Sequence, residues 1–494
     1  MNKQNATIRR LPTGVKGLDD ILGGGIPEFS FNLIAGSPGA GKTTLAHQMM
    51  FAMATPERPA LYFTVLGEPA LKMLRYQQQF DFFDPEQVNS SIRFVNLADD
   101  TANGDLDKVL ARIVEEVRAH APGFVFVDSF RSVILATQSD GDAFLSLQEF
   151  IQRLGILLTS WEATTFLLGE YFSDTEPNPI FTVADGLIWL RQSVQRNSVV
   201  RKLEIVKMRG QPTLPGLHTF RITQAGLMVF VPPPTTSLAS EATAVPPLQD
   251  RRNVGVAGLD EMLGGGLPRG YSLLIAGPSG SGKSILAAAF LAEGARQGET
   301  GVIAAFEQRS LHSRGAVIAG LIEDGRIGVI DTRSSTLSVD EITLLLIEEV
   351  QRLKATRVVI DSLSGFELAL APTFRDDFRE SLARLVSALA DTGATVLMTS
   401  ELEDRYSELS FSPYGTAFLT DAIIVQRYIE VGSRLERVLA VVKVRGSAHS
   451  HDLRLFDIDD DGLQLGERLA GHEGLLGGRP KRVIEAAPPG APRG

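Results

Sequence analysis

Short apolar runs alternate along the chain with amphipathic segments, and this alternation predicts strands and helices in turn. Runs that are apolar on both faces suit strands of a parallel sheet that helices cover on both sides. They span residues 31–36, 60–66, 92–97, 123–128, 164–169 and 186–191 in the first half, and 273–277, 301–306, 327–331, 357–361, 395–400 and 422–428 in the second. Between them, residues 107–120 and 339–355 repeat apolar positions every three or four residues, as crossover helices do.

Each half ends on a different pattern. Residues 201–210 and 218–223 in the first half, and 436–446 and 453–458 in the second, resemble consecutive strands of antiparallel hairpins. The acidic stretch 457–461 before Gly462 is interpreted as a hairpin turn and not as a calcium loop, because no Glu stands at the loop-closing position. The pattern as a whole predicts an α/β fold with a mostly parallel central sheet flanked by helices.

The two halves are copies of one module. GVKGLDDILGGGIP at 14–27 aligns with GVAGLDEMLGGGLP at 255–268, and the same offset of 241 positions superimposes FNLIAGSPGAGKTTLA on SLLIAGPSGSGKSILA. So long a period indicates a duplicated domain and not a solenoid. We expect a first domain at 1–230, a Pro/Ser/Thr-rich linker at 231–250, a second domain at 251–465 and a disordered tail at 466–494.

Composition excludes several classes of protein. The 494 residues include no cysteine, which excludes disulfides, thiolate zinc sites and cysteine nucleophiles. No apolar run reaches the length of a membrane span, and the polar N-terminal segment lacks the apolar stretch of a signal peptide, so we expect a cytoplasmic protein. The net charge of −11 disfavours DNA as a partner, because non-specific DNA binding depends on neutralising phosphates.

The phosphate-binding motif G-x-x-x-x-G-K-[ST] occurs at 36–43 and again at 277–284, each time between a predicted strand and a predicted helix. Glycines let backbone amides wrap around a phosphate, and the helix adds its positive end. We expect Lys42 and Lys283 to reach the β- and γ-phosphates, and the hydroxyls of Thr43 and Ser284 to bind Mg²⁺. The predicted ATP-binding residues of the loops are Gly36, Gly39, Ala40, Gly41, Lys42, Thr43 and Thr44, and Gly277, Gly280, Ser281, Gly282, Lys283, Ser284 and Ile285.

Acidic residues at the ends of other strands are candidates for the remaining chemistry. Asp128 and Asp361 end buried strands, where each would hold the Mg²⁺ shell through water or else merely cap the following loop. Glu307, 24 residues after Lys283, is the candidate base that polarises the attacking water and a further metal candidate, unless it is a surface strand-end residue. The first copy has Leu66 at that position and its nearest acid, Glu68, two residues later, which predicts two sites of unequal hydrolytic competence.

Together, the repeat, the GLDxxLGGGxP segments, the paired phosphate loops and K-x-R-G resemble the KaiC family, tandem RecA/DnaB-type ATPases, over both domains. The resemblance implies a two-tiered hexameric ring with ATP between neighbouring subunits, slow hydrolysis and, in some members, Ser/Thr autophosphorylation. It also implies that the motif K-x-R-G-[ST]-x-H contacts the nucleotide of the adjacent subunit. The second copy has all of it in Lys443, Arg445, Ser447 and His449, whereas the first retains the basic pair Lys207 and Arg209. A solvated basic strand face is the alternative.

Two departures from the family pattern change what the resemblance implies. The adjacent Glu-Glu of active members is replaced by Glu307-Gln308 in the second copy and by Leu66-Gly67 in the first. The Ser-Thr pair of autokinase members is replaced by Ala417 and Phe418, with Thr416 and Thr420 as neighbouring substitutes.

Two functional hypotheses follow. In the first, the protein is a ring ATPase whose nucleotide state sets its affinity for signalling partners. In the second, it is a RecA- or DnaB-like motor on DNA. The acidic net charge favours the first hypothesis.

Overall fold

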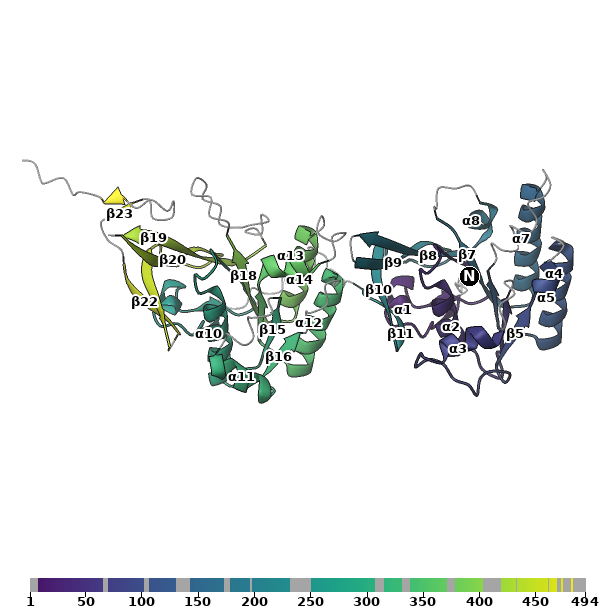
Figure 1. Ribbon diagram of the computed structural model, residues 1–494, viewed down its shortest axis with the longest axis horizontal. Helices are drawn as coiled ribbons and strands as arrows, with labels where there is room; N and C mark the ends of the chain where they lie inside the picture. The colour runs from purple at the N-terminus through teal and green to yellow at the C-terminus, as the bar shows by residue number, and fades with distance from the viewer. Residues whose placement is uncertain are drawn as a thin grey trace, which may run out of the picture. The chain divides into compact units, whose positions relative to one another are not determined.

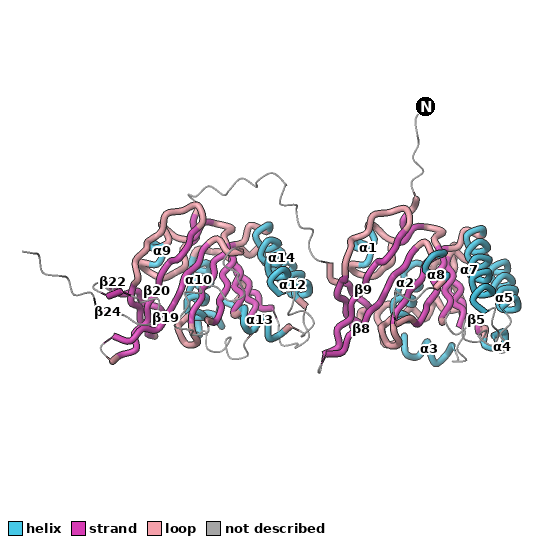
Figure 2. Tube along the Cα trace, turned by 90° about the horizontal axis from the view of Figure 1, so that it is seen from above, coloured by secondary structure: helices cyan, strands magenta, loops and turns pink. Residues whose placement is uncertain are grey.

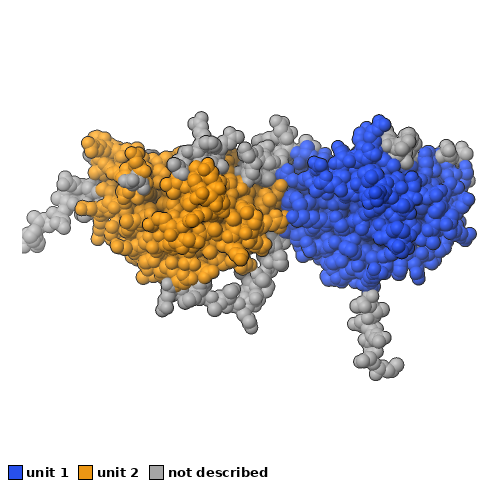
Figure 3. Space-filling model, turned by 90° about the horizontal axis from the view of Figure 1, so that it is seen from below, with its two compact units in different colours: residues 1–231 blue, residues 232–494 orange. Residues whose placement is uncertain are grey.

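A computed structural model describes two α/β units in one chain. The described residues are 8–64, 70–101, 106–129, 143–172, 178–195, 198–231, 250–306, 315–330, 338–370, 378–402, 419–431, 433–460, 462–468, 472–473 and 481–482. The chain divides into compact units at 1–231 and 232–494, coloured separately in Figure 3. None of the described helices has the length and apolar character needed to cross a membrane.

The first unit follows the alternation expected from the sequence (Figure 1). Its elements are β1 (Arg10–Leu11), α1 (Leu18–Leu22), β2 (Ile26–Pro27), β3 (Phe31–Gly36), α2 (Lys42–Met53), β4 (Ala60–Thr64), α3 (Ala70–Gln77), β5 (Ile92–Asn96), α4 (Ala98–Thr101), α5 (Leu106–His120), β6 (Phe124–Asp128), α7 (Ala143–Ser160), β7 (Thr164–Glu170), α8 (Pro179–Val183), β8 (Gly186–Gln195), β9 (Ser198–Met208), β10 (Leu217–Thr223) and β11 (Gly226–Val229).

The second unit repeats most of this order. Its elements are β12 (Arg251–Arg252), α9 (Leu259–Met262), β13 (Leu267–Pro268), β14 (Ser272–Gly277), α10 (Lys283–Arg296), β15 (Gly301–Ala305), α11 (Gly315–Glu323), β16 (Ile327–Ile330), α12 (Val339–Leu353), β17 (Arg357–Asp361), α13 (Leu363–Ala369), α14 (Phe378–Asp391), β18 (Thr395–Glu401), β19 (Ala422–Val431), β20 (Arg434–Val444), β21 (Arg454–Asp459), β22 (Gly462–Arg468), β23 (His472–Glu473) and β24 (Lys481–Arg482).

Each unit is built on a nine-stranded sheet. The order is β11-β10-β9-β8-β3-β7-β6-β4-β5 in the first unit, and the second has the equivalent order β22-β21-β20-β19-β14-β18-β17-β15-β16. The strands from β8 to β5 are parallel, and β9, β10 and β11 add antiparallel hairpins. This confirms the predicted α/β fold with two tandem RecA-like domains, including the hairpins at the end of each copy.

Side chains that alternate along the strands fill two cores, one on each face of the sheet. In the first unit, Ile34, Tyr62 and Phe126 pack with helix α2, whereas the intervening Leu33, Phe63 and Val127 pack with helices α5 and α7. Figure 2 shows α5 and α7 together on one side of the strands and α2 on the other. Because these strands run parallel, the carboxyl ends of β3, β4, β6 and β7 lie at one end of the sheet.

The C-terminal end differs from the expected tail. Strand β22 continues to Arg468, past the boundary predicted at 465, because its residues pair with β21 in the hairpin whose turn the sequence indicated. Beyond it, His472–Glu473 pairs antiparallel with Lys481–Arg482. Part of 466–494 is therefore strand, and the prediction of a disordered tail beginning at 466 was wrong for these residues.

Candidate functional site

The two phosphate loops have the strand–turn–helix form that the motif requires. Each loop leaves a central parallel strand, and helices α2 and α10 begin at the motif lysines. The residues before those lysines, Gly41 and Gly282, have φ of 106° and 98°, a backbone conformation that strongly favours glycine. A Cβ atom at either glycine would also lie 2.7 Å from the Cδ1 atom of an isoleucine, Ile222 or Ile458. Conformation and crowding together explain why both positions are glycine.

The motif lysines lie across the mouths of their loops. Lys42 Nζ donates to the carbonyl oxygens of Gly36 at 3.0 Å and Ser37 at 2.9 Å. Lys283 Nζ donates likewise to Gly277 at 2.9 Å and to the next residue, Pro278, at 2.6 Å. Burial lowers the pKa of Lys42, and the nearby carboxylates of Glu170 and Asp128 partly oppose this. Both ammonium groups are therefore held over the inside of the loop, where a phosphate would bind.

A cavity opens beside each loop. The cavity of the first unit, of about 370 Å³, is lined by Gly39, Gly41, Lys42, Thr43, Thr44, Thr64, Met73, Asp128, Ser129, Glu170 and Ile222. That of the second unit, of about 270 Å³, is lined by Ser279, Gly280, Gly282, Lys283, Ser284, Ile285, Asp361, Ser362 and Glu401. Most of the predicted loop residues meet in these cavities. Ala40 is instead fully buried, and the buried Ser281 donates its hydroxyl to Gln426 Oε1 at 3.1 Å.

The strand-end aspartates lie where the sequence predicted them. Asp128 ends β6, and its Oδ2 accepts from the Thr43 hydroxyl at 2.9 Å and from the Tyr62 hydroxyl at 2.8 Å. Burial raises the pKa of Asp128, and the two hydroxyl donors oppose that shift. Asp361 ends β17, is 4% exposed and accepts from the Thr399 hydroxyl at 2.5 Å. Each aspartate thus shares its cavity with the hydroxyl residue that follows the motif lysine.

Sequence reasoning missed one acidic residue in each cavity. Glu170 ends β7 beside Gly36, and Glu401 ends β18 beside Gly277. The signal was present, because TTFLLGE and TVLMTSE both end a buried strand on Glu at equivalent positions of the repeat. Glu170 interacts electrostatically with both Lys42 and Asp128, so it belongs to the charge balance of the first site.

The basic pairs near the ends of β9 and β20 lie against a neighbouring turn. Lys207 Nζ donates to the carbonyls of Thr182 and Ala184 at 3.1 and 2.5 Å, and Arg209 forms an ion pair with Asp185 at 3.0 Å. Burial lowers the pKa of Lys207, and the adjacent Arg209 lowers it further. The second unit repeats this arrangement, with Lys443 on the Thr420 carbonyl at 2.5 Å and Arg445 paired with Asp421 at 3.2 Å.

A β-bulge precedes the lysine of each basic pair, Lys207 in β9 and Lys443 in β20. In β9 the pairing with β8 shifts between Lys207 and Ile205, and in β20 the pairing with β19 shifts between Lys443 and Val441. One residue on each strand is therefore extra, and such bulges redirect the side chains that follow. Both arginines remain largely accessible, with 59% of each side chain exposed.

The basic pairs lie at the end of the sheet opposite the phosphate loops. Asp185, the partner of Arg209, bonds to the backbone of Phe31 at the first residue of β3. The loop begins at Gly36, five residues along the same strand, which corresponds to about 16 Å at 3.3 Å per residue. In the second unit, Asp421 bonds to Ser272, the first residue of β14, and the loop begins at Gly277.

The remaining motif residues of the second copy fold back onto their own unit. Ser447 Oγ accepts from Arg251 at 2.6 Å, and His449 contacts the Ser447 carbonyl at 3.4 Å. His449 also lies edge-on to His451. Within the part of the chain that the structure describes, no group of three or more His, Asp or Glu side chains forms a metal-binding cluster.

Several sequence candidates lie outside the described residues. They are Glu68 and Glu307, with Leu66, Gly67 and Gln308, and positions 416–418. Thr420, the other possible substitute for the phosphorylation pair, is described and is fully buried.

Comparisons with known proteins agree over nearly the whole chain. A protein-family model described as the KaiC ATPase matches residues 11–233 and again residues 253–470. The circadian clock oscillator protein KaiC of Thermostichus vulcanus is 26% identical over 498 residues, which cover 97% of this chain and 93% of the relative. The circadian clock oscillator protein KaiC 1 of Synechocystis is 26% identical, with 96% and 92% covered, and KaiC of Nostoc is 25% identical, with 98% and 94% covered.

Proposed function

This chain belongs to the KaiC family of ATPases, and from that premise we propose that both units bind Mg-ATP and that nucleotide state switches the affinity for signalling partners. The ATP lies with its phosphates in the cavity of each loop. Lys42 and Lys283 hold the terminal phosphates, and the amides at the start of α2 and α10 surround them. The glycines before these helices let the backbone approach the phosphates closely.

The oxygen donors in the first cavity suit Mg²⁺. The Thr43 hydroxyl and the Asp128 carboxylate come from different elements and meet at 2.9 Å on the cavity wall, and magnesium prefers such oxygen ligands. Thr43 and Ser284 would bind the metal, and Asp128 and Asp361 would hold its water shell. The ion, when bound, neutralises charge that develops on the phosphates. Glu307 orients the attacking water in the second site.

The observation that supports assembly is the position of the basic pairs. Arg209 and Arg445 are exposed at the end of the sheet opposite their own phosphate loops, about 16 Å away along the central strand. They are too far from the nucleotide of their own unit, yet a head-to-tail neighbour would bring them to its nucleotide. Such a contact repeats from subunit to subunit, and it closes into a ring when the rotation between subunits permits. We propose that this ring is a hexamer of the KaiC type.

The experiment that tests this proposal is native mass spectrometry with and without Mg-ATP. The full chain is expected to assemble with nucleotide, and Arg445→Ala is expected to weaken assembly and slow hydrolysis by roughly 10³-fold or more, the effect of lost finger arginines. Arg434→Ala, at the exposed other end of β20, is the control. If Arg445→Ala assembles and hydrolyses ATP as the wild type does, the proposed cross-subunit contact is wrong.

The two sites are proposed to divide the work. Lys283→Ala should abolish most turnover, whereas Lys42→Ala should mainly weaken assembly, because the first copy lacks a base at position 66. Glu307→Gln should slow hydrolysis by roughly 10²–10⁴-fold and spare ATP binding. A Lys42→Ala protein that remains assembled but loses its turnover would contradict this division.

Two activities of related proteins are tested separately. A DNA motor would show strong stimulation of ATPase by single-stranded DNA at moderate salt, whereas we expect none, because the chain has a net charge of −11. Autophosphorylation at 417 and 418 is not proposed, because Ala and Phe carry no hydroxyl. Phosphopeptide mapping after incubation with Mg-ATP would reveal any use of Thr416 or Thr420.

A further inference from the structure

In the two copies, the equivalent strand-end aspartate accepts a hydrogen bond from opposite neighbouring strands. In the first unit the donor is Tyr62 on β4, one neighbour of the strand that carries Asp128. In the second unit the donor is Thr399 on β18, the other neighbour of the strand that carries Asp361. We propose that Tyr62 is a positioning residue of the first site, whose hydroxyl orients Asp128 and thereby sets the Mg²⁺ affinity of that site.

Comparison of the two copies shows that each has an apolar residue where the other has its hydroxyl donor. The position equivalent to Tyr62 in the second unit is Ile303, which carries no polar group. The position equivalent to Thr399 in the first unit is Leu168, one residue past Leu167, which pairs with Val127. In each copy a neighbouring strand therefore supplies a hydroxyl donor to the aspartate, and the strand whose equivalent position is apolar in one copy supplies that donor in the other.

The Tyr62 ring has little freedom to point elsewhere. Its side chain is fully buried, stacked on Phe126 with ring centroids 6.0 Å apart and set edge-on to His47 at 4.7 Å. In the strand register, Tyr62 faces Phe126 and Thr64 faces Asp128. The ring thus extends along the strand direction to the carboxylate two residues ahead, a distance of about 6.6 Å that a tyrosine spans.

The Tyr62 hydroxyl restrains the Asp128 carboxylate, a group that needs hydrogen-bond donors. The tyrosine and Thr43 hydroxyls both donate to Oδ2 of Asp128, from a strand on one side and from the phosphate-binding helix on the other. Two donors on one oxygen fix the rotation of the carboxylate. A partly buried carboxylate that loses a donor costs more to keep charged, and outer hydrogen-bond partners typically change metal affinity by 10- to 100-fold.

This inference rests on the proposed function, because it assumes that Asp128 holds the water shell of Mg²⁺ in the first site. It adds that the two sites can differ in metal affinity although both retain the aspartate. Thr399 reaches Asp361 by a short side chain from the adjacent position, whereas Tyr62 reaches Asp128 by the full length of its ring.

The test is equilibrium binding of a fluorescent ATP analogue to the full chain in a Lys283→Ala background, which removes the lysine of the second site. The analogue is titrated at rising Mg²⁺ and again in EDTA. Tyr62→Phe removes one oxygen and retains the aromatic packing. We expect its Mg²⁺ midpoint to rise about tenfold or more, with the affinity in EDTA unchanged.

Two further variants separate positioning from general damage. Adding Leu168→Thr to Tyr62→Phe imports the donor of the second unit and should restore the Mg²⁺ midpoint. Thr399→Val, in the other unit, should leave it unchanged. An unchanged midpoint in Tyr62→Phe, an equal loss of affinity in EDTA, or a failed restoration by threonine would overturn the inference. Absence of any Mg²⁺ dependence in the Lys283→Ala parent would instead refute the proposed Mg-ATP site itself.

Discussion

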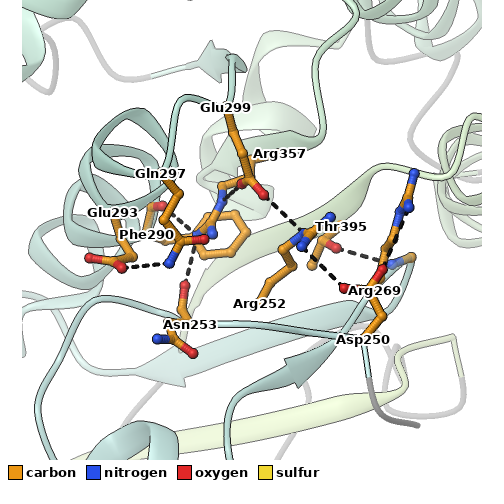
Figure 4. Close-up of polar contacts among 11 residues, drawn as sticks. Asp250, Arg252, Asn253, Arg269, Phe290, Glu293, Gln297, Glu299, Arg357 and Thr395 are labelled. Atoms are coloured by element: carbon orange, nitrogen blue, oxygen red, sulfur yellow. Dashed lines mark hydrogen bonds and ion pairs between the residues drawn. The ribbon is translucent and has the colours of Figure 1, made fainter. Parts of the chain in front are cut away.

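A buried arginine in the second unit offers a sharp test of how this fold is stabilised. Figure 4 shows Arg357, 1% exposed, pointing from β17 toward Glu299 and toward the chain at Asn253. Its Nε donates to Glu299 at 2.6 Å, and its Nη1 donates to the carbonyls of Asn253 and Phe290 at 2.7 and 2.8 Å. The guanidinium also lies over the Phe290 ring, 4.6 Å from its centroid. One side chain therefore joins β17, helix α10 and the entry segment of the unit.

We predict that Arg357→Ala destabilises the second unit by about 4 kcal/mol, within the range for breaking a buried ion pair. The substitution leaves two buried carbonyls without this donor and Glu299 with Arg252 alone, at 3.0 Å. Burial lowers the pKa of Arg357, and Glu299 opposes that shift, so the carboxylate offsets part of the cost of burying the guanidinium charge. The control is Arg352→Ala, an exposed arginine paired with Glu349, which should leave stability unchanged.

The assay uses an asymmetry in the sequence. Both tryptophans, Trp161 and Trp189, belong to the first unit, so their fluorescence reports unfolding there, whereas circular dichroism reports both units. Denaturation of Arg357→Ala without nucleotide should move the dichroism transition of the second unit and leave the fluorescence transition in place. A dichroism midpoint equal to that of Arg352→Ala would refute the argument that this buried pair stabilises the unit.

Two further predictions concern the first site and the phosphate loop. Burial lowers the pKa of His47 to about 4. In the unfolded chain this pKa is near 6.5, so the unfolded chain binds more protons in acid. The contribution of His47 to the free energy of unfolding is complete above pH 6.5 and is lost as the pH falls toward 4, by about 2 kcal/mol at pH 5. In His47→Leu, the fluorescence-detected stability of the first unit should decline less steeply over that window, and an equal decline would contradict the assignment to His47. Gly282→Ala should weaken nucleotide binding and lower stability by more than Gly298→Ala, because both glycines have positive φ but only at Gly282 would a Cβ lie 2.7 Å from Ile458. Equal stability losses in thermal melts would show that crowding at the loop does not matter.

Much of the candidate site could be predicted from local sequence patterns. The phosphate loops, with Lys42 and Lys283, were identified from glycine spacing, and Asp128 and Asp361 from their place at the ends of apolar runs. Each of these inferences needs only residues adjacent along the chain, and the duplication supplied an independent second example. The antiparallel hairpins and the parallel sheet followed from periodicity alone, which strand geometry imposes on the residues themselves.

Contacts between strands could not be predicted from these local patterns. Glu170 and Glu401 became visible as site residues only when their strands lay beside the loop strands. The exchange of Tyr62 for Thr399 depends on which strands flank β6 and β17, and therefore on strand order and register. Arg357, which occurs in an ordinary strand sequence, binds a carboxylate 58 residues earlier.

By itself, then, the sequence determined the duplicated α/β architecture and the two glycine-rich loops, since short-range spacing decides these features. Only the tertiary structure decided which hydroxyls donate to each aspartate, which buried charge is paired, and that the basic pairs lie at the far end of the sheet from their own loops. The physical reason is that hydrogen bonds and ion pairs form between atoms that are close in space. Strand order and register, and not distance along the chain, bring those atoms together.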